Sequence, residues 1–150
     1  MINIISFKTK IGWITAHEEK NRILLVTLSK SKNKGKSKKL LDFKKKIFNF
    51  FNRKNKYLNS NIFLSGTNLQ IKIWKELKKI PYGKTKSYGE IAKKFKTSPR
   101  YVGNVCGQNR HLLVIPCHRV IRSDGKLGGF SGTGGIKTKK KLLKFEGAIK

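Results

Sequence analysis

Acidic residues are scarce in this 150-residue chain. Seven Asp and Glu residues stand against 36 Lys and Arg residues, so the formal net charge is +29 at pH 7. Cysteine is rarer still, with two residues. Two cysteines cannot build the disulfide framework of a small secreted protein, so we expect both as free thiols in a reducing compartment. Apolar residues make up 37% of the chain, enough for a modest core in one domain or two small ones.

Long apolar runs are also missing. The longest, Leu112–Pro116, is far too short to span a bilayer, and the first ten residues lack the apolar stretch of a secretory signal. We therefore expect no membrane contact and a cytoplasmic location. The chain has no CxxC, no HExxH and no Cys/His cluster at ligand spacing. This predicts no metal site, and we expect no other cofactor.

The excess of positive charge has two interpretations that the composition leaves open. A surface this basic repels itself unless a polyanion neutralises it, and nucleic acid is the usual partner. Almost all of the charge is Lys, however, and Asn, Ile and Phe are abundant too. These residues have AT-rich codons, so a biased genome would place Lys on any solvated face. Charge alone therefore supports nucleic-acid binding only weakly.

The first part of the chain reads as a small α/β support domain over 1–64. β-branched and aromatic residues over 1–28 predict strands of an antiparallel sheet, with a polar connection at 17–21. The lysine-rich stretch 29–39 predicts a mobile loop. Apolar residues then recur at helical spacing and predict a helix near 38–53 that covers one face of the sheet.

Helical patterns dominate the second part, 65–150. Thr67 or Asn68, Ser87 and Ser98 are placed to cap successive short helices. A short helix, a turn and a further helix predict a helix-turn-helix unit, and a last helix is expected near 137–146. The expected fold is α+β, with a small antiparallel sheet and a helix followed by a mostly helical domain.

The segment 113–121 carries the chemistry. A strand-like apolar run leads into Pro116-Cys117-His118. A nucleophilic cysteine needs a base to remove its proton, and a carboxylate beyond a histidine base would fix its tautomer. Glu146 and Asp124 are the candidate carboxylates. A cysteine in an apolar run is more often a core residue, and neighbouring side chains on a strand point to opposite faces, so spacing alone favours packing here. We interpret Cys106, among helical apolar positions, as structural.

The motifs of the second part resemble the O6-alkylguanine-DNA alkyltransferases, also called methylated-DNA–protein-cysteine methyltransferases. IPCHRVI at 115–121 is similar to the family's active-site signature. Similar segments follow the same order along the chain over about 67–148: LQIKIW at 69–74, IPYGKTKSYGEIA at 80–92, RYVG at 100–103, GGFSG at 128–132 and LLKFEG at 142–147. Over 1–64 the resemblance is limited to a Thr-x-Ile-Gly hairpin at 9–12.

This resemblance implies a fold and an activity. The sheet part would be ribonuclease H-like and the helix-turn-helix part winged-helix-like. Cys117 would take a methyl or alkyl group from O6-alkylguanine in duplex DNA, after the damaged nucleotide is flipped out of the helix; O4-alkylthymine is a further candidate. His118 would accept the thiol proton through a water molecule, and Glu146 would orient His118. The thioether is stable, so the enzyme, a methylated-DNA–[protein]-cysteine S-methyltransferase, would act once.

The resemblance also implies binding residues. The substrate-binding positions would be Tyr88, Val120, Phe130 and Ser131. Ser98, Arg100 and Tyr101 would contact DNA in its minor groove, with Arg100 filling the space left by the flipped nucleotide. Asn109 would brace the active-site turn as a structural hinge. The expected partner is double-stranded DNA containing O6-alkylguanine, bound by a monomer in the cytoplasm and, when on DNA, at the nucleoid.

Some positions depart from the family's pattern. Tyr101 follows Arg100 where relatives often have a small residue, and Arg110-His111 replaces a common proline. These departures motivate an alternative function, a lesion-sensing or regulatory DNA-binding protein with little transfer activity. A thiol enzyme unrelated to DNA is a third interpretation, with little support in the sequence.

Overall fold

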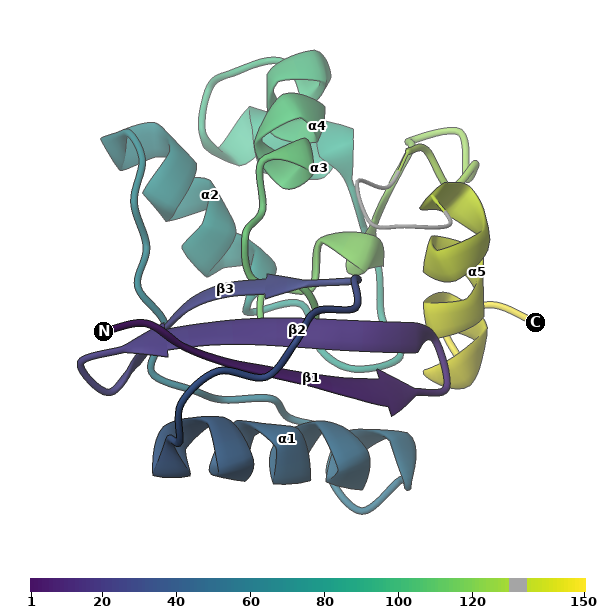
Figure 1. The fold of residues 1–150 in the computed structure, drawn as a ribbon. Coiled ribbons are helices and arrows are strands. Elements are labelled where there is room, and N and C mark those ends of the chain that lie inside the picture. Colours follow the sequence, from purple (N-terminus) through teal and green to yellow (C-terminus); the bar gives the residue numbers. More distant parts are fainter. Residues whose placement is uncertain (130–134) are drawn as a thin grey trace. The chain divides into compact units, whose positions relative to one another are not determined.

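The computed structural model describes residues 1–129 and 135–150, and the chain divides into two compact units. One comprises Met1–Leu64 with Arg110–Val114, and the other comprises Ser65–Asn109 with Ile115–Lys150. The units are therefore not consecutive along the chain. The expected α+β class is confirmed, because an antiparallel three-stranded sheet occurs together with helices (Figure 1).

The first unit is built on the strands β1 (Asn3–Thr9), β2 (Gly12–Glu19) and β3 (Arg22–Thr27), in the order β1-β2-β3. The predicted polar connection at 17–21 is too long. β2 continues to Glu19, and only Lys20 and Asn21 turn the chain, with φ of 52° and 62°. Two successive residues at positive φ make a tight hairpin turn whose twist matches that of the strands.

Helix α1 (Lys38–Phe51) covers one face of this sheet, as predicted, and ends two residues before the expected boundary (Figure 1). Ser37 caps its first turn by accepting a hydrogen bond from the Leu40 amide. Its buried residues recur three, four and seven apart, which places them on one side of the helix; they are Leu40, Phe43, Ile47, Phe50 and Phe51.

The free edge of β3 explains why Arg110–Val114 belong to this unit. The Val26 amide donates to the Arg110 carbonyl at 2.7 Å, and the Leu112 amide donates to the Val26 carbonyl at 3.2 Å. These bonds satisfy backbone groups that an exposed strand edge would leave unpaired. The run at 112–116 is buried, as expected, but it is not a strand: Leu113 has φ of 69°, and the chain there forms successive tight turns.

The second unit contains α2 (Asn68–Leu77), α3 (Tyr88–Lys94), α4 (Pro99–Gly107) and α5 (Gly135–Phe145), with a 3₁₀ turn, η1 (Cys117–Arg119). Two-residue strands β4 (Lys86–Ser87) and β5 (Val120–Ile121) pair in parallel. Thr67, Ser87 and Ser98 cap α2, α3 and α4, as predicted. α3 and α4 pack together as the expected helix-turn-helix, and α5 begins two residues earlier than expected.

Among residues 1–129 and 135–150, no helix is both long and apolar enough to cross a membrane. In the same ranges, no group of three or more His, Cys, Asp or Glu side chains is arranged to hold a metal ion.

Candidate active site

Cys117 opens the 3₁₀ turn η1 and lines a cavity of about 830 Å³ in the second unit. The cavity is also lined by residues of α3, α4 and the segment 122–129, including Tyr88, Arg100, Gly103, Cys106, Arg122 and Asp124. The Cys117 side chain is 5% exposed, so its sulfur lies in a cavity wall rather than on an open surface. A cavity of this size is in the range that holds a small ligand or a nucleobase.

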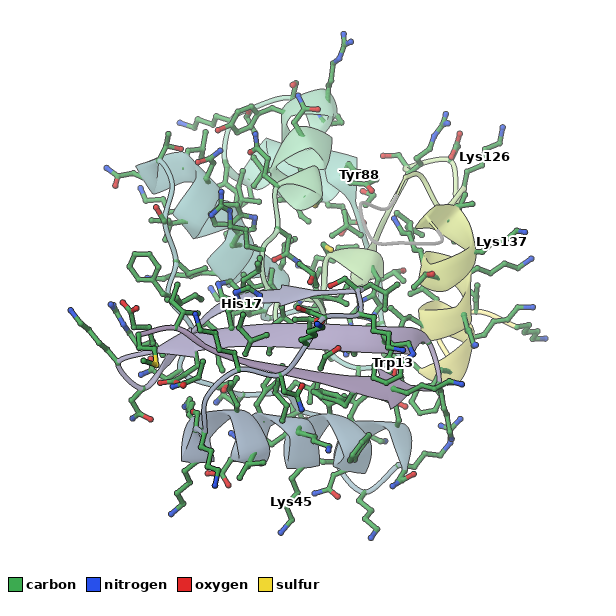
Figure 2. All side chains as sticks on the ribbon, in the orientation of Figure 1. Trp13, His17, Lys45, Tyr88, Lys126 and Lys137 are labelled. Atoms are coloured by element: carbon green, nitrogen blue, oxygen red, sulfur yellow. The ribbon has the colours of Figure 1, made fainter. Side chains whose placement is uncertain are left out.

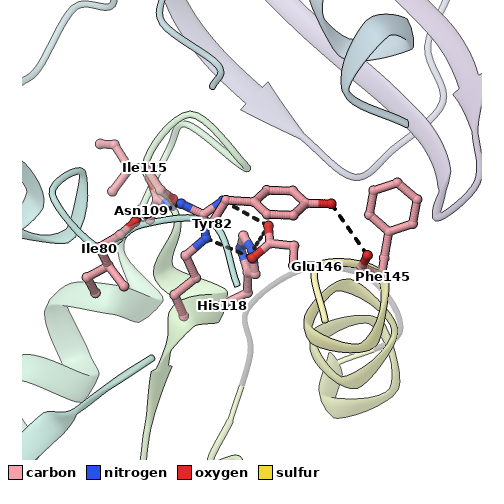
Figure 3. Close-up of polar contacts among 8 residues, drawn as sticks. Ile80, Tyr82, Asn109, Ile115, His118, Phe145 and Glu146 are labelled. Carbon is pink, nitrogen blue, oxygen red and sulfur yellow. Dashed lines mark hydrogen bonds and ion pairs between the residues drawn. The ribbon is translucent and has the colours of Figure 1, made fainter. Parts of the chain in front are cut away.

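Asn109 contacts the sulfur directly. Its side-chain Nδ2 donates to the Ile115 carbonyl at 2.9 Å (Figure 3). The same nitrogen donates to Cys117 Sγ at 3.3 Å. Burial raises the pKa of the Cys117 thiol, while the hydrogen bond from Asn109 and the charge of Lys139 act in the opposite direction. The thiol is therefore protonated at rest, but the groups around it favour the thiolate once its proton has been removed.

His118 and Glu146 form the pair that the sequence suggested. His118 Nε2 lies 2.8 Å from Glu146 Oε2, and both side chains are almost fully buried (Figure 3). Because a carboxylate only accepts hydrogen bonds, we assign the imidazole proton to Nε2. Burial lowers the pKa of His118 more than Glu146 raises it, so the ring is neutral. Its Nδ1 is buried without a hydrogen-bond partner among the described residues, which leaves a basic nitrogen available.

Arg119, which the sequence analysis did not single out, fixes the carboxylate from its other side. Its Nε donates to Glu146 Oε1 at 2.8 Å and its Nη2 to Oε2 at 2.9 Å. Its Nη1 donates to the Ile80 carbonyl at 2.8 Å. Burial alone would raise the pKa of Glu146, but the hydrogen bonds from His118 and Arg119 outweigh it and lower the pKa to about 2. Glu146 is thus a permanent anion at neutral pH.

A second buried network surrounds Lys139 of α5. Its Nζ donates to the Val120 carbonyl at 2.6 Å, to Tyr88 Oη at 3.2 Å and to the Gly129 carbonyl at 3.2 Å. Burial lowers the pKa of Lys139 to about 8, and burial raises the pKa of Tyr88. The sequence did not single out Lys139, although its position in the last helix marks it as unusual. Lys139 lies three and four positions before Leu142 and Leu143, on the apolar side of the last helix.

Tyr88 lies at the wall of the cavity, as expected for a residue that touches a ligand there. Gly128 approaches its ring closely: a Cβ on Gly128 would lie 3.1 Å from Tyr88 Cε2, and the backbone there has φ of 75°. Glycine alone adopts that conformation without strain. Gly128 therefore lets the chain pass beside the tyrosine ring.

The helix-turn-helix residues contribute unequally to the cavity. Arg100 is exposed and lines it, from the first turn of α4. Ser98 is the N-cap of that helix, where its hydroxyl accepts from the Tyr101 amide at 3.1 Å, and Tyr101 is half-buried. Ser98 therefore has a structural role in addition to its predicted contact with DNA. Phe130 and Ser131 lie outside the described residues.

Cys106, interpreted as structural, is buried in α4 but also lines the cavity. Burial raises the pKa of its thiol to about 12. Asp124, the other candidate carboxylate, pairs instead with Arg122 at 2.9 Å, and both side chains are substantially exposed. Glu146 is therefore the carboxylate that reaches His118.

Comparison with known proteins agrees with this arrangement. Residues 68–148 match the family model for the DNA-binding domain of 6-O-methylguanine DNA methyltransferase. The methylated-DNA–protein-cysteine methyltransferase of Sulfolobus acidocaldarius is 37% identical over 143 residues, which cover 94% of this chain and 90% of that protein.

Solved structures agree as well. The O6-methylguanine methyltransferase of Mycobacterium tuberculosis superposes with a TM-score of 0.83 at 29% identity, over 99% of this chain and 94% of that one. The same organism's protein in complex with DNA gives a TM-score of 0.82 at 29% identity, over 97% and 92% of the two chains. The chain therefore belongs to the family of methylated-DNA–protein-cysteine methyltransferases, which are DNA-repair enzymes.

Proposed function

We propose that this protein repairs DNA by transferring the alkyl group of O6-alkylguanine irreversibly to Cys117. One observation carries the proposal: a thiol lies in the wall of a base-sized cavity, and the next residue in the chain is a buried histidine. A carboxylate holds one nitrogen of this histidine, and the other has no hydrogen-bond partner among residues 1–129 and 135–150. The O6 substituent of a stacked guanine is out of reach of a buried sulfur. The damaged nucleotide would therefore flip out of the duplex and into the cavity.

The transfer is a substitution at the alkyl carbon. The Cys117 sulfur forms a bond to that carbon, the bond from carbon to O6 breaks, and its electron pair returns to the purine. The thiol proton goes to Nδ1 of His118 through a water molecule, since this basic nitrogen has no hydrogen-bond partner in the described part of the chain. Glu146 stabilises the imidazolium that results, and Arg119 keeps Glu146 in place. No group hydrolyses a thioether, so each protein molecule reacts once.

The leaving purine is stabilised by the second network. The Tyr88 hydroxyl is at the cavity wall and would donate to the flipped base as negative charge develops on it. Lys139 donates to Tyr88 Oη, which orients the phenol and makes its proton a stronger donor. The carbonyls of Cys117 and Val120 would accept from the exocyclic amine of guanine. Phe130 and Ser131 would complete the substrate loop, and O4-alkylthymine is a further candidate substrate.

DNA would be held by residues 65–150 through the helix-turn-helix. We propose that α4 enters the minor groove, with Ser98, Arg100 and Tyr101 at the duplex, and that a monomer acts in the cytoplasm and at the nucleoid. The relative solved in complex with DNA supports DNA as the partner. The complete buried arrangement of His118, Glu146 and Arg119 favours transfer over the alternative of a lesion sensor, which needs no proton acceptor beside the thiol.

Intact mass spectrometry tests the proposal. Protein mixed with duplex DNA containing O6-methylguanine should gain the mass of one methylene group, mapped by proteolysis to Cys117. The gain should stop at one per molecule, even with excess DNA. Tight binding of the lesion with unchanged protein mass would favour the lesion sensor instead.

Replacing Arg100 by alanine should impair repair of duplex DNA more than reaction with the free base O6-benzylguanine. Flipping costs a few kcal/mol in a duplex and nothing for a free base, so we expect a roughly ten- to hundredfold slower reaction on the duplex only. Single-turnover rates on both substrates measure this. Lys93→Ala, which removes one exposed charge from α3, is the control. Equal losses on both substrates would contradict the role of Arg100 in flipping.

Replacing Lys139 by methionine should slow transfer about 10²-fold, because Tyr88 loses the donor that positions it. Lys139 acts through Tyr88 and is a positioning residue. The pKa of Lys139 is about 8 in the folded protein, whereas that of an unperturbed lysine is 10.5. Between pH 8 and pH 10.5 the unfolded chain therefore binds more protons than the folded one, so the free energy of unfolding rises with pH in this range. Urea unfolding from pH 8 to 10.5 should show this rise in the native protein and a flatter profile in the variant. An unchanged transfer rate would contradict the role.

A further inference from the structure

The lysine-rich segment that joins β3 to α1 is not the mobile loop that its composition predicts. The Ile4 amide donates to the Lys34 carbonyl at 2.8 Å, and the Lys34 amide returns a bond to the Ile4 carbonyl at 2.9 Å. The Ser6 amide donates to Asn33 Oδ1 at 2.8 Å. The segment is therefore fixed along the outer edge of β1, where it satisfies amides that an edge strand leaves unpaired.

Every second residue from 29 to 37 has a contact that holds the segment in place. The Ser29 carbonyl accepts from Thr15 Oγ1 at 2.8 Å, and the Ser31 amide donates to Ser6 Oγ at 3.2 Å. Gly35, at φ of 70°, passes so close to Asn3 that a Cβ would clash with its side chain. Ser37 caps α1. The contacts that hold the segment therefore come from its odd-numbered residues and from the backbone of Lys34, and they do not use the Lys34 side chain.

The even-numbered positions from 30 to 38 are all lysine, and all are exposed. Lys30 Nζ lies over the Trp13 ring, 4.6 Å from its centroid. Trp13 itself lies toward one end of the sheet (Figure 2). Lys32, Lys34 and Lys36, which we call the lysine row, have no carboxylate partner among residues 1–129 and 135–150. Three uncompensated cations held next to each other repel one another, and a bound polyanion relieves that repulsion.

We propose that the lysine row is a binding site for the phosphate backbone of duplex DNA, located in the first unit and separate from the helix-turn-helix. In an extended chain alternate residues are about 6.6 Å apart, so Lys32 and Lys34, with their long flexible side chains, can reach separate phosphates of one DNA strand. Lys36 follows the bend at Gly35 and adds the next cation along the chain. A fixed backbone has little conformational entropy to lose on binding, in contrast to a mobile loop.

The chemistry of the row indicates sequence-independent contact. Lysine carries a point charge on a flexible side chain, which suits contact with phosphate. It lacks the planar pair of donors with which arginine makes bidentate hydrogen bonds to a base. The inference does not depend on alkyl transfer, since its ligand is undamaged DNA. It gives the first unit a direct part in holding the substrate polymer.

The test compares two triple variants of the full chain. Lys32, Lys34 and Lys36 are changed to glutamine in one, and Lys20, Lys45 and Lys54 in the other. The control lysines are exposed on the same unit, and Lys45 points away from the sheet on α1 (Figure 2). Both variants lose the same charge. Affinity for an undamaged duplex is measured by fluorescence anisotropy from 50 to about 200 mM salt.

In the row variant, the plot of log affinity against log salt concentration should be less steep by about 2 to 3. Each phosphate contact contributes about 0.9 to the steepness of this plot, and the variant loses three lysines. The control variant should keep most of the native slope. Equal losses in both variants, or a native slope in the row variant, would overturn the proposal. A further result would also overturn it: the row variant no longer floats with anionic phosphatidylserine vesicles, while its DNA binding is unchanged.

A measurement on the unmodified protein keeps the proposal testable if a variant fails to fold. Acetylation of exposed lysines by an amine-reactive ester, followed by peptide mass spectrometry, reports which amines DNA covers. Duplex DNA should protect Lys32, Lys34 and Lys36 several-fold more than Lys20, Lys45 and Lys54. Equal protection of the two sets would overturn the proposal. Transfer from free O6-benzylguanine should be unchanged in the row variant, which separates this test from that of alkyl transfer.

Discussion

Cys117→Ser should abolish the mass gain on duplex DNA containing O6-methylguanine. A thiolate is a strong nucleophile, whereas a serine hydroxyl is protonated and weak at neutral pH, so we expect transfer to slow by more than about 10⁴-fold. The exchange of sulfur for oxygen removes little volume from the cavity wall, and DNA affinity should stay within a factor of a few. Intact mass and anisotropy measurements on the same preparation separate the two effects.

Cys106→Ser is the matched control for this variant. The same substitution is made in the same cavity, on a thiol that has no histidine next to it in the chain and whose pKa burial raises to about 12. This variant should gain the methyl group at a rate within a few-fold of the native protein. A methyl group found on Cys106, or transfer that survives in Cys117→Ser, would show that the alkyl acceptor has been assigned to the wrong sulfur.

Replacing Glu146 by glutamine should lower both stability and transfer. The amide group cannot accept all of the hydrogen bonds that the carboxylate receives from His118 and Arg119, so a buried guanidinium loses its counter-ion. Removing one partner of a buried ion pair costs about 3 to 5 kcal/mol. His118 would also lose the anion that stabilises its imidazolium form, and we expect transfer to slow about 10²- to 10⁴-fold.

The pH dependence of stability provides a second readout for Glu146. Its pKa is about 2 in the folded protein, below the value of 4.5 for an unperturbed side chain. The stability that this carboxylate contributes is therefore complete above pH 4.5 and is lost as the pH falls from 4.5 toward 2. Urea unfolding between pH 7 and pH 3 should show a shallower decline for Glu146→Gln than for the native protein.

Asp124→Asn tests whether any carboxylate would have this effect. Asp124 pairs with Arg122 at 2.9 Å, but its side chain is 44% exposed and that of Arg122 is 56% exposed. An exposed pair contributes about 0 to 1 kcal/mol. The variant should therefore unfold almost like the native protein at each pH. A loss as large as that of Glu146→Gln would mean that net charge, rather than the buried pair, governs the acid sensitivity.

Local patterns in the sequence were sufficient for most elements of secondary structure. The apolar spacing of α1, with Leu40, Phe43 and Ile47 on one side, predicted both the helix and the face it buries. Ser98 followed by Pro99 predicted the start of α4. These features depend on contacts within one or two turns of the chain, so a short window of residues determines them. The order of the motifs around Cys117 likewise indicated the family.

Long-range contacts decided what those patterns could not. The apolar run before Cys117 reads as a strand, but it forms turns, since the 110–112 stretch is bonded to the edge of β3 and the chain must then return to the second unit. The lysine-rich stretch 29–39 has the composition of a mobile loop. Its order comes from strands that precede it in the chain: it pairs with the outer edge of β1, and the Thr15 side chain of β2 donates to the Ser29 carbonyl.

The sequence by itself determined which atoms can react: one sulfur beside a histidine, and so few carboxylates that only Glu146 and Asp124 were candidates as its partner. The tertiary structure decided which carboxylate serves, by placing Glu146 beyond the end of α5 against His118 and Arg119. It also decided that Lys139 belongs to the site, because burial and three acceptors turn one of 36 similar cations into a positioned donor. Residue identity sets the chemistry available, whereas pKa and orientation depend on neighbours that are distant in the chain.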